Sequence, residues 1–132
     1  MFVITTEKLI NLSFVYNTNM DSEKDILKEN IKKFLNSAWI VYQTKDYTSA
    51  AILYFKAMFA IFDIDILIKL GRTPKDHSER FRILGKNFPN SYAVLDKLYP
   101  IYRGSYTLIT TKQECDEVKQ NVEIIVKEQR IL

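Results

Sequence analysis

Apolar residues recur with helical spacing over most of the chain. After an acid-rich segment that starts at Asp21, they follow one another at intervals of three and four: Leu27, Ile31, Phe34, Leu35, Ala38 and Tyr42. Such spacing places them on one face of a helix. Asp21 can cap its start, and the pattern ends near Gln43.

The next segment is apolar on nearly every side. It starts near Asp46 and ends at Gly71, a residue suited to the left-handed conformation that closes a helix, and Pro74 prevents continuation. Small residues alternate with aromatic ones: Ser49, Ala50, Ala51, Ala57 and Ala60 with Tyr47, Tyr54, Phe55, Phe59 and Phe62. Such a helix needs cover on all sides, so we predict that it is the centre of a helical bundle.

A membrane span is the competing interpretation, because residues 50–70 are about long enough to cross a bilayer. Four charged residues argue against it: Lys56, Asp63, Asp65 and Lys69. Each costs roughly 2.5–3.5 kcal/mol near the centre of an inserted helix. The N-terminus also lacks the order of regions that a signal peptide requires. We therefore expect a soluble, cytoplasmic protein without a membrane partner.

Two shorter helices are predicted after Pro74. Asp76 or Ser78 can cap the first, and Asn90 or Ser91 can begin the second. Pro100 lies inside the second, where it predicts a kink or break. The second helix carries most of the remaining aromatic and large apolar residues, namely Leu95, Leu98, Tyr99, Tyr102 and Tyr106.

A final helix begins with a capping box formed by Thr111 and Glu114. Its inward stripe is Cys115, Val118, Val122 and Ile125. The whole pattern predicts an all-α bundle of four main helices and a short one, over residues 21–132. Residues 1–20 are an N-terminal extension of uncertain structure: residues 2–5 have strand-like composition, Thr6 can cap a helix to about Leu12, and residues 17–19 resemble a connector.

Composition excludes several classes of site. The chain has one cysteine and one histidine, Cys115 and His77, so an internal disulfide and a zinc site built on several of these residues are excluded. Its three glycines are isolated, so phosphate-cradling loops are absent. We expect no metal and no cofactor.

Positive charge is concentrated in one segment. Residues 69–86 contain six basic and two acidic residues, a net charge of +4 against +3 for the whole chain. The basic residues are Lys69, Arg72, Lys75, Arg80, Arg82 and Lys86. Next to several tyrosines, such a cluster is compatible with binding of a polyanion, and an ordinary exposed helix face explains it equally well.

Two arginines are candidates for contact with phosphate. Arg72 and His77 lie at the two ends of a short loop, where a guanidinium and an imidazole can converge on one phosphate. Ribonuclease chemistry requires such a pair of groups. The alternative is that His77 is structural and only joins helix ends by hydrogen bonds. Arg103 shares a helix face with Tyr99 and Tyr106, so its guanidinium can stack on a ring and bind phosphate, or simply tie helices together.

The chain resembles the HEPN family, in particular its small archaeal and bacterial members of the nucleotidyltransferase-associated or PaREP-like type. The resemblance covers about residues 21–130. It rests on the order of four segments: KDYTSAAILYFKAMFAIFDIDILIKLG, TPKDHSERFRILGKNF, LDKLYPIYRGSY and the TKQECDEV helix. It implies an up-and-down bundle of four to five helices that forms a homodimer.

For function, the resemblance implies either a metal-independent endoribonuclease, often a toxin, or a non-catalytic dimer that accompanies a nucleotidyltransferase and binds nucleotide or RNA. Ribonuclease members carry an arginine followed by a polar residue and a histidine. Arg103 fits the arginine, but residues 104–110 contain no histidine. Tyr106 resembles the arginine-then-tyrosine pattern of the members that accompany nucleotidyltransferases.

We therefore predict a dimeric nucleotide- or RNA-binding protein, with a nucleotidyltransferase as a candidate partner in a toxin–antitoxin type of system. The predicted binding residues are Arg103, Tyr106, Tyr99, Arg72, Lys75, Arg80, Arg82 and Lys86. The alternatives are an active endoribonuclease, with Arg103 and His77 as catalytic candidates, and a structural dimer that binds only a protein.

Overall fold

The computed structural model describes the backbone of residues 6–129 and the side chains of residues 20–129. It contains five α-helices: α1 (Thr6–Gln43), α2 (Tyr47–Leu70), α3 (His77–Asn87), α4 (Pro89–Gly104) and α5 (Lys112–Gln129). The described residues form no strand, so the predicted all-α class is confirmed. None of these helices combines the length and the apolar character that crossing a membrane requires.

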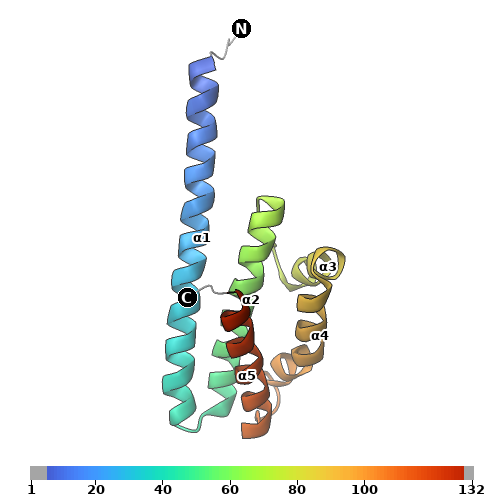
Figure 1. Ribbon diagram of the computed structural model, residues 1–132. Helices are drawn as coiled ribbons and strands as arrows, with labels where there is room; N and C mark the ends of the chain where they lie inside the picture. Colours follow the sequence, from blue (N-terminus) through green and yellow to red (C-terminus); the bar gives the residue numbers. More distant parts are fainter. Residues whose placement is uncertain (1–5, 130–132) are drawn as a thin grey trace.

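Helix α2 lies at the centre of the fold. Helix α1 lies along one side of it, α3 and α4 lie on the other side, and α5 packs on it between α1 and α4 (Figure 1). More than half of the buried apolar residues belong to α2, among them Phe55, Met58, Ile61, Phe62 and Ile66. The central position predicted for this segment therefore agrees with the structure.

The ends of α2 and the start of α3 follow the cap signals of the sequence. The Asp46 carboxylate accepts a hydrogen bond from the Ser49 backbone N–H at 3.0 Å. Gly71 adopts the left-handed conformation, with φ 79°, and its N–H bonds to the Leu67 carbonyl at 2.8 Å. Asp76 caps α3 by accepting from the Glu79 N–H at 2.8 Å. Local chemistry thus fixes the loop between α2 and α3 at both ends.

Helix α5 starts with the predicted capping box. The Glu114 N–H donates to Thr111 Oγ1 at 3.1 Å, and the Thr111 N–H donates to Glu114 Oε1 at 3.0 Å. The predicted stripe of Cys115, Val118, Val122 and Ile125 is buried. It packs mainly against α2.

The predicted helix start at Asp21 is wrong. Helix α1 runs without interruption from Thr6, so residues 17–19 form no connector and Asp21 is an interior residue rather than a cap. The N-terminal part of α1 extends beyond the end of α2 (Figure 1). A helix can pass such residues because each added residue contributes a hydrogen bond after nucleation. The strand-like residues 2–5 lie outside the described part of the chain.

Helix α4 also differs from the prediction. It begins at Pro89 rather than Asn90 or Ser91, with proline at the first helical position, where its missing N–H costs nothing. The helix continues through Pro100 to Gly104. Pro100 leaves the Asp96 carbonyl without its helical partner, but both residues are exposed, so water can satisfy that oxygen.

Candidate functional site

Five aromatic side chains form a row along α3 and α4, which we call the aromatic row: Tyr92, Phe81, Tyr99, Tyr102 and Tyr106. Successive ring centroids in that order lie 6.0, 4.8, 5.5 and 5.7 Å apart. The middle of the row packs on the core, whereas Tyr92 is 36% exposed and Tyr106 is 74% exposed at the two ends. The row therefore offers ring surface to solvent at both ends.

His77 lies beside the middle of the aromatic row. Its ring centroid is 5.9 Å from that of Tyr99, 5.5 Å from that of Tyr102 and 4.7 Å from that of Phe59 on α2. Burial, with the Arg80 charge as a second cause, lowers the pKa of His77 below its usual value. The imidazole is thus neutral at pH 7.

Arg80 is an internal residue, which differs from its predicted role in binding phosphate. Its Nε donates to Asp63 Oδ1 at 2.7 Å and its Nη2 donates to Asp63 Oδ2 at 2.9 Å. The two side chains are 11% and 13% exposed. Because Asp63 neutralises this guanidinium inside the bundle, Arg80 is not available to a ligand.

Glu79 shares its carboxylate between the α2–α3 loop and α3. It forms an ion pair with Arg72, accepts from the Lys75 backbone N–H at 3.4 Å and lies 3.9 Å from Arg82. Arg72 therefore pairs with Glu79, and the described hydrogen bonds of His77 do not include Arg72. The Lys75 and Lys86 side chains are exposed and form no ion pair with the described residues.

Arg103 is exposed in the last turn of α4. Among the described side chains it forms no ion pair or ring contact, so the predicted stacking of its guanidinium on a tyrosine is not present in this structure. Helix α4 ends at Gly104, and Tyr106 lies in the turn that follows it. Instead, the Tyr106 hydroxyl lies 3.0 Å from that of Tyr102.

Two buried groups are unsuited to nucleophilic or acid–base roles at neutral pH. Burial, followed by the hydrogen bond to Tyr106, raises the pKa of Tyr102 to about 12. Burial raises the pKa of the Cys115 thiol to about 11. Both groups remain protonated, and a buried thiol is a poor nucleophile.

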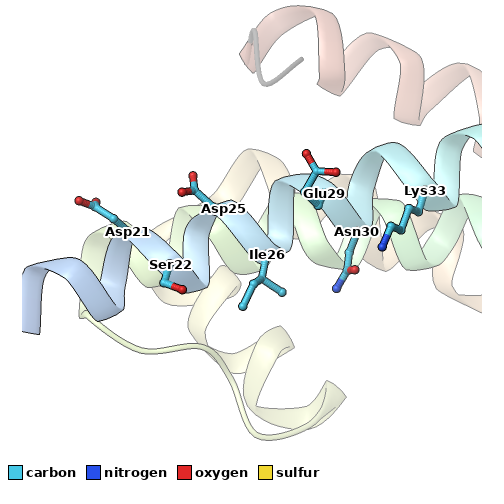
Figure 2. Close-up of a pocket in the computed structure, with 7 residues that line it drawn as sticks. All are labelled: Asp21, Ser22, Asp25, Ile26, Glu29, Asn30 and Lys33. Carbon is cyan, nitrogen blue, oxygen red and sulfur yellow. The ribbon is translucent and has the colours of Figure 1, made fainter.

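An open hollow of about 470 Å³ lies along the exposed side of α1 (Figure 2). Its carboxylates, Asp21, Asp25 and Glu29, recur at intervals of four residues along one side of the helix. They repel phosphate. Within the described residues, no group of three or more histidine, cysteine, aspartate or glutamate side chains is placed to hold a metal ion.

The sequence indicated His77 but not the residues that surround it. The spacing of His77 and Arg80, three apart on one helix, is a signal that could have linked them. Asp63 and Phe59 come from a different helix, and no local pattern connects them to His77.

Comparison of the chain with protein-family models, curated proteins and solved structures gives no match. The resemblance to the HEPN family therefore stays a prediction.

Proposed function

We propose that the protein is a homodimeric, HEPN-like protein of the cytoplasm that binds nucleotide or RNA on the face formed by α3 and α4. The observation that carries this proposal is the aromatic row with its two exposed ends. Aromatic rings bind unpaired bases by stacking, and this contact tolerates any base sequence. A single unpaired thiol, Cys115, fits the reducing conditions of the cytoplasm.

Exposed bases beside the row supply the charge that such binding needs. Arg82 and Lys86 belong to α3, Lys75 precedes it and Arg103 lies next to Tyr102. Their side chains are exposed and can neutralise phosphates without breaking the fold. This distribution of charge favours binding of a polyanion near the tyrosines rather than at the acidic hollow on α1.

Endoribonuclease activity is supported less well. His77 is neutral and packs against three aromatic rings, and its described neighbours supply no second free acid or base. No histidine follows Arg103 within residues 104–110. A chemically complete ribonuclease site needs one group to take a proton and another to stabilise the charged phosphate. The nucleotidyltransferase partner and the toxin–antitoxin setting rest on the resemblance alone.

Tyr106→Ala is expected to weaken binding of short single-stranded RNA by about 5- to 150-fold, because one stacked base contributes roughly 1–3 kcal/mol. The exposed ring contributes little to the core, so the fold should persist. Fluorescence anisotropy with labelled RNA, and with labelled adenine nucleotide, measures the effect. Trp39→Ala is the matched control, because Trp39 is an exposed ring on α1 away from the row and its loss should leave affinity unchanged.

The salt dependence of RNA affinity is a second measurement in the same assay. For a single strand, affinity should fall by roughly 0.7 log units per log unit of salt for each phosphate contact. Changing Lys75, Arg82 or Lys86 to methionine should flatten this slope, and Arg103→Met should lower affinity further because its planar fork can bind phosphate in a bidentate manner. Absence of binding at low salt would reject the proposal and favour a protein partner. Metal-free RNA cleavage that His77→Ala abolishes would favour the endoribonuclease instead.

Dimer formation is supported by apolar side chains that the single chain leaves uncovered. The densest run is in the α4–α5 connection, where Leu108 is 71% and Ile109 is 89% exposed beside Tyr106. Other large exposed apolar residues are Ile26, Trp39, Ile40, Ile68, Leu70, Tyr92 and Ile124. A two-fold dimer covers the same patch on both copies.

Light scattering at micromolar concentration should therefore give twice the 15.5 kDa protomer mass. The double variant Leu108→Lys/Ile109→Lys should shift the protein toward the monomer, because burying lysines in an apolar contact is costly. Gln120→Lys, at an exposed polar position on α5, is the control for a general effect of added charge. A monomer mass for the unaltered protein would contradict dimer formation.

A further inference from the structure

The His77 ring is held in place by its neighbours. It is the first residue of α3 and follows the cap residue Asp76. Phe59 from α2 and Tyr99 and Tyr102 from α4 surround its ring, with centroid distances of 4.7, 5.9 and 5.5 Å. Because these rings come from two helices that both pack on α3, the imidazole has a defined orientation.

One ring nitrogen faces a group that can only donate. His77 Nδ1 lies 2.6 Å from Nη1 of Arg80. A guanidinium carries hydrogen-bond donors only and stays protonated in proteins. Nδ1 must therefore be the acceptor, since two N–H groups cannot face each other at this distance. A neutral imidazole whose Nδ1 accepts carries its proton on Nε2.

Arg80 is itself fixed. Its bidentate pairing with Asp63 uses Nε and Nη2, which leaves Nη1 directed at His77. Its guanidinium carbon lies 4.8 Å from the centroid of the Phe59 ring. A chain of hydrogen bonds therefore runs from Asp63 on α2 through Arg80 to His77.

We infer that Asp63 and Arg80 are positioning residues that keep His77 as a neutral imidazole with its proton on Nε2, so that this nitrogen serves as a hydrogen-bond donor and not as a proton acceptor. Nε2 has no hydrogen-bond partner among the described residues and is not a buried unpaired atom, so it reaches solvent. Resting on the proposed function, we assign to Nε2–H a contact with an acceptor of the nucleotide or RNA, such as a phosphate oxygen or a base carbonyl. The hydrogen bond from Nε2–H to the ligand is therefore independent of pH as long as His77 stays neutral.

The charges around His77 agree with this state. Burial has the largest effect on its pKa and lowers it, and Arg80 and Lys56 lower it too, whereas Asp63 and Asp76 raise it. The facing tyrosines on α4 are Tyr99 and Tyr102, and the hydroxyl of Tyr102 stays protonated at neutral pH because its own pKa is raised to about 12. The net result is a pKa below the ordinary value of 6.5.

The chain has a single histidine, so nitrogen NMR of the uniformly labelled full chain gives one imidazole without assignment. Long-range proton–nitrogen correlation at neutral pH should show a protonated Nε2 and an unprotonated Nδ1. The titration midpoint should lie below that of the same chain unfolded in urea. A protonated Nδ1, an even mixture of the two tautomers, or a midpoint at or above the unfolded value would overturn the inference.

Variants separate positioning from a merely structural role. Arg80→Met should allow both tautomers and raise the titration midpoint. If that variant unfolds, Asp63→Asn/Arg80→Met, which leaves no unpaired charge, should show the same loss of tautomer preference. Arg82→Met is the control, because that side chain is 64% exposed on the same helix and should leave the His77 spectrum unchanged. An unchanged spectrum in the double variant would also overturn the inference.

The ligand contact is tested separately by adding the short RNA used in the anisotropy assay. The Nε2–H signal should shift on binding, and His77→Phe should weaken binding while keeping the ring packing. If RNA does not bind at all, the proposed function fails, but the tautomer result stands. If RNA binds without moving this signal, the ligand contact assigned to His77 is rejected while the binding function remains.

Discussion

Arg80→Met is expected to lower the free energy of unfolding by about 3–5 kcal/mol, as breaking a buried ion pair from one side does. The variant leaves the Asp63 carboxylate in a largely buried position without its bidentate partner. It also removes the cation over the Phe59 ring and the donor to His77 Nδ1. Urea denaturation followed by circular dichroism measures the loss.

Two further variants test this explanation. Asp63→Asn/Arg80→Met should recover much of the lost stability, because neither remaining group carries a buried charge. Arg72→Met removes an ion pair in which the arginine side chain is 52% exposed, so it should cost only about 0–1 kcal/mol. Equal losses for Arg72→Met and Arg80→Met would show that burial does not distinguish the two pairs.

Phe55→Ala is expected to lower the free energy of unfolding by about 3–5 kcal/mol through lost burial and a cavity. Phe55 is fully buried in the middle of α2. Its ring centroid lies 5.3 Å from that of Tyr102 and 6.0 Å from that of Phe59, so the substitution removes contacts to both the core and the aromatic row.

Ile68→Ala on the same helix is the control. Ile68 is 59% exposed, so its truncation should change stability by no more than about 0.5 kcal/mol. The same urea experiment compares the two variants. A small effect of Phe55→Ala would mean that the bundle closes around the cavity and that α2 is not the centre of the core.

The helix pattern was largely predictable because α2, α3 and α5 carry both apolar periodicity and local cap chemistry. Each cap bonds to a backbone group three or four residues away, so the sequence alone reveals it. These caps are Asp46, Gly71, Asp76 and the Thr111–Glu114 box. The start of α1 was missed because Asp21 has cap chemistry in a position where it does not act as a cap. A capping residue favours a helix end but cannot impose one.

The candidate site was less predictable because its geometry joins different helices. Tyr99 and His77 were identified from local patterns, but Asp63 is separated from Arg80 by the whole α2–α3 loop. The ion pair between Asp63 and Arg80 makes Arg80 an internal residue, whereas the sequence predicts that it contacts a ligand. The sequence predicts Arg103 and Tyr106 on one helical face, but α4 ends at Gly104 and Tyr106 contacts Tyr102 from the turn that follows.

The order of helix contacts along the chain also bears on folding kinetics. The most extensive contact joins α1 and α2, which are neighbours in sequence. Helix α5 also packs on α2, but α3 and α4 separate the two in the sequence. Local contacts close short loops at low entropic cost, so the α1–α2 hairpin is favoured early and the docking of α5 late. The only tryptophan, Trp39 on α1, lies 5.5 Å from Nζ of Lys119 on α5. Its environment is therefore completed only when the last helix docks.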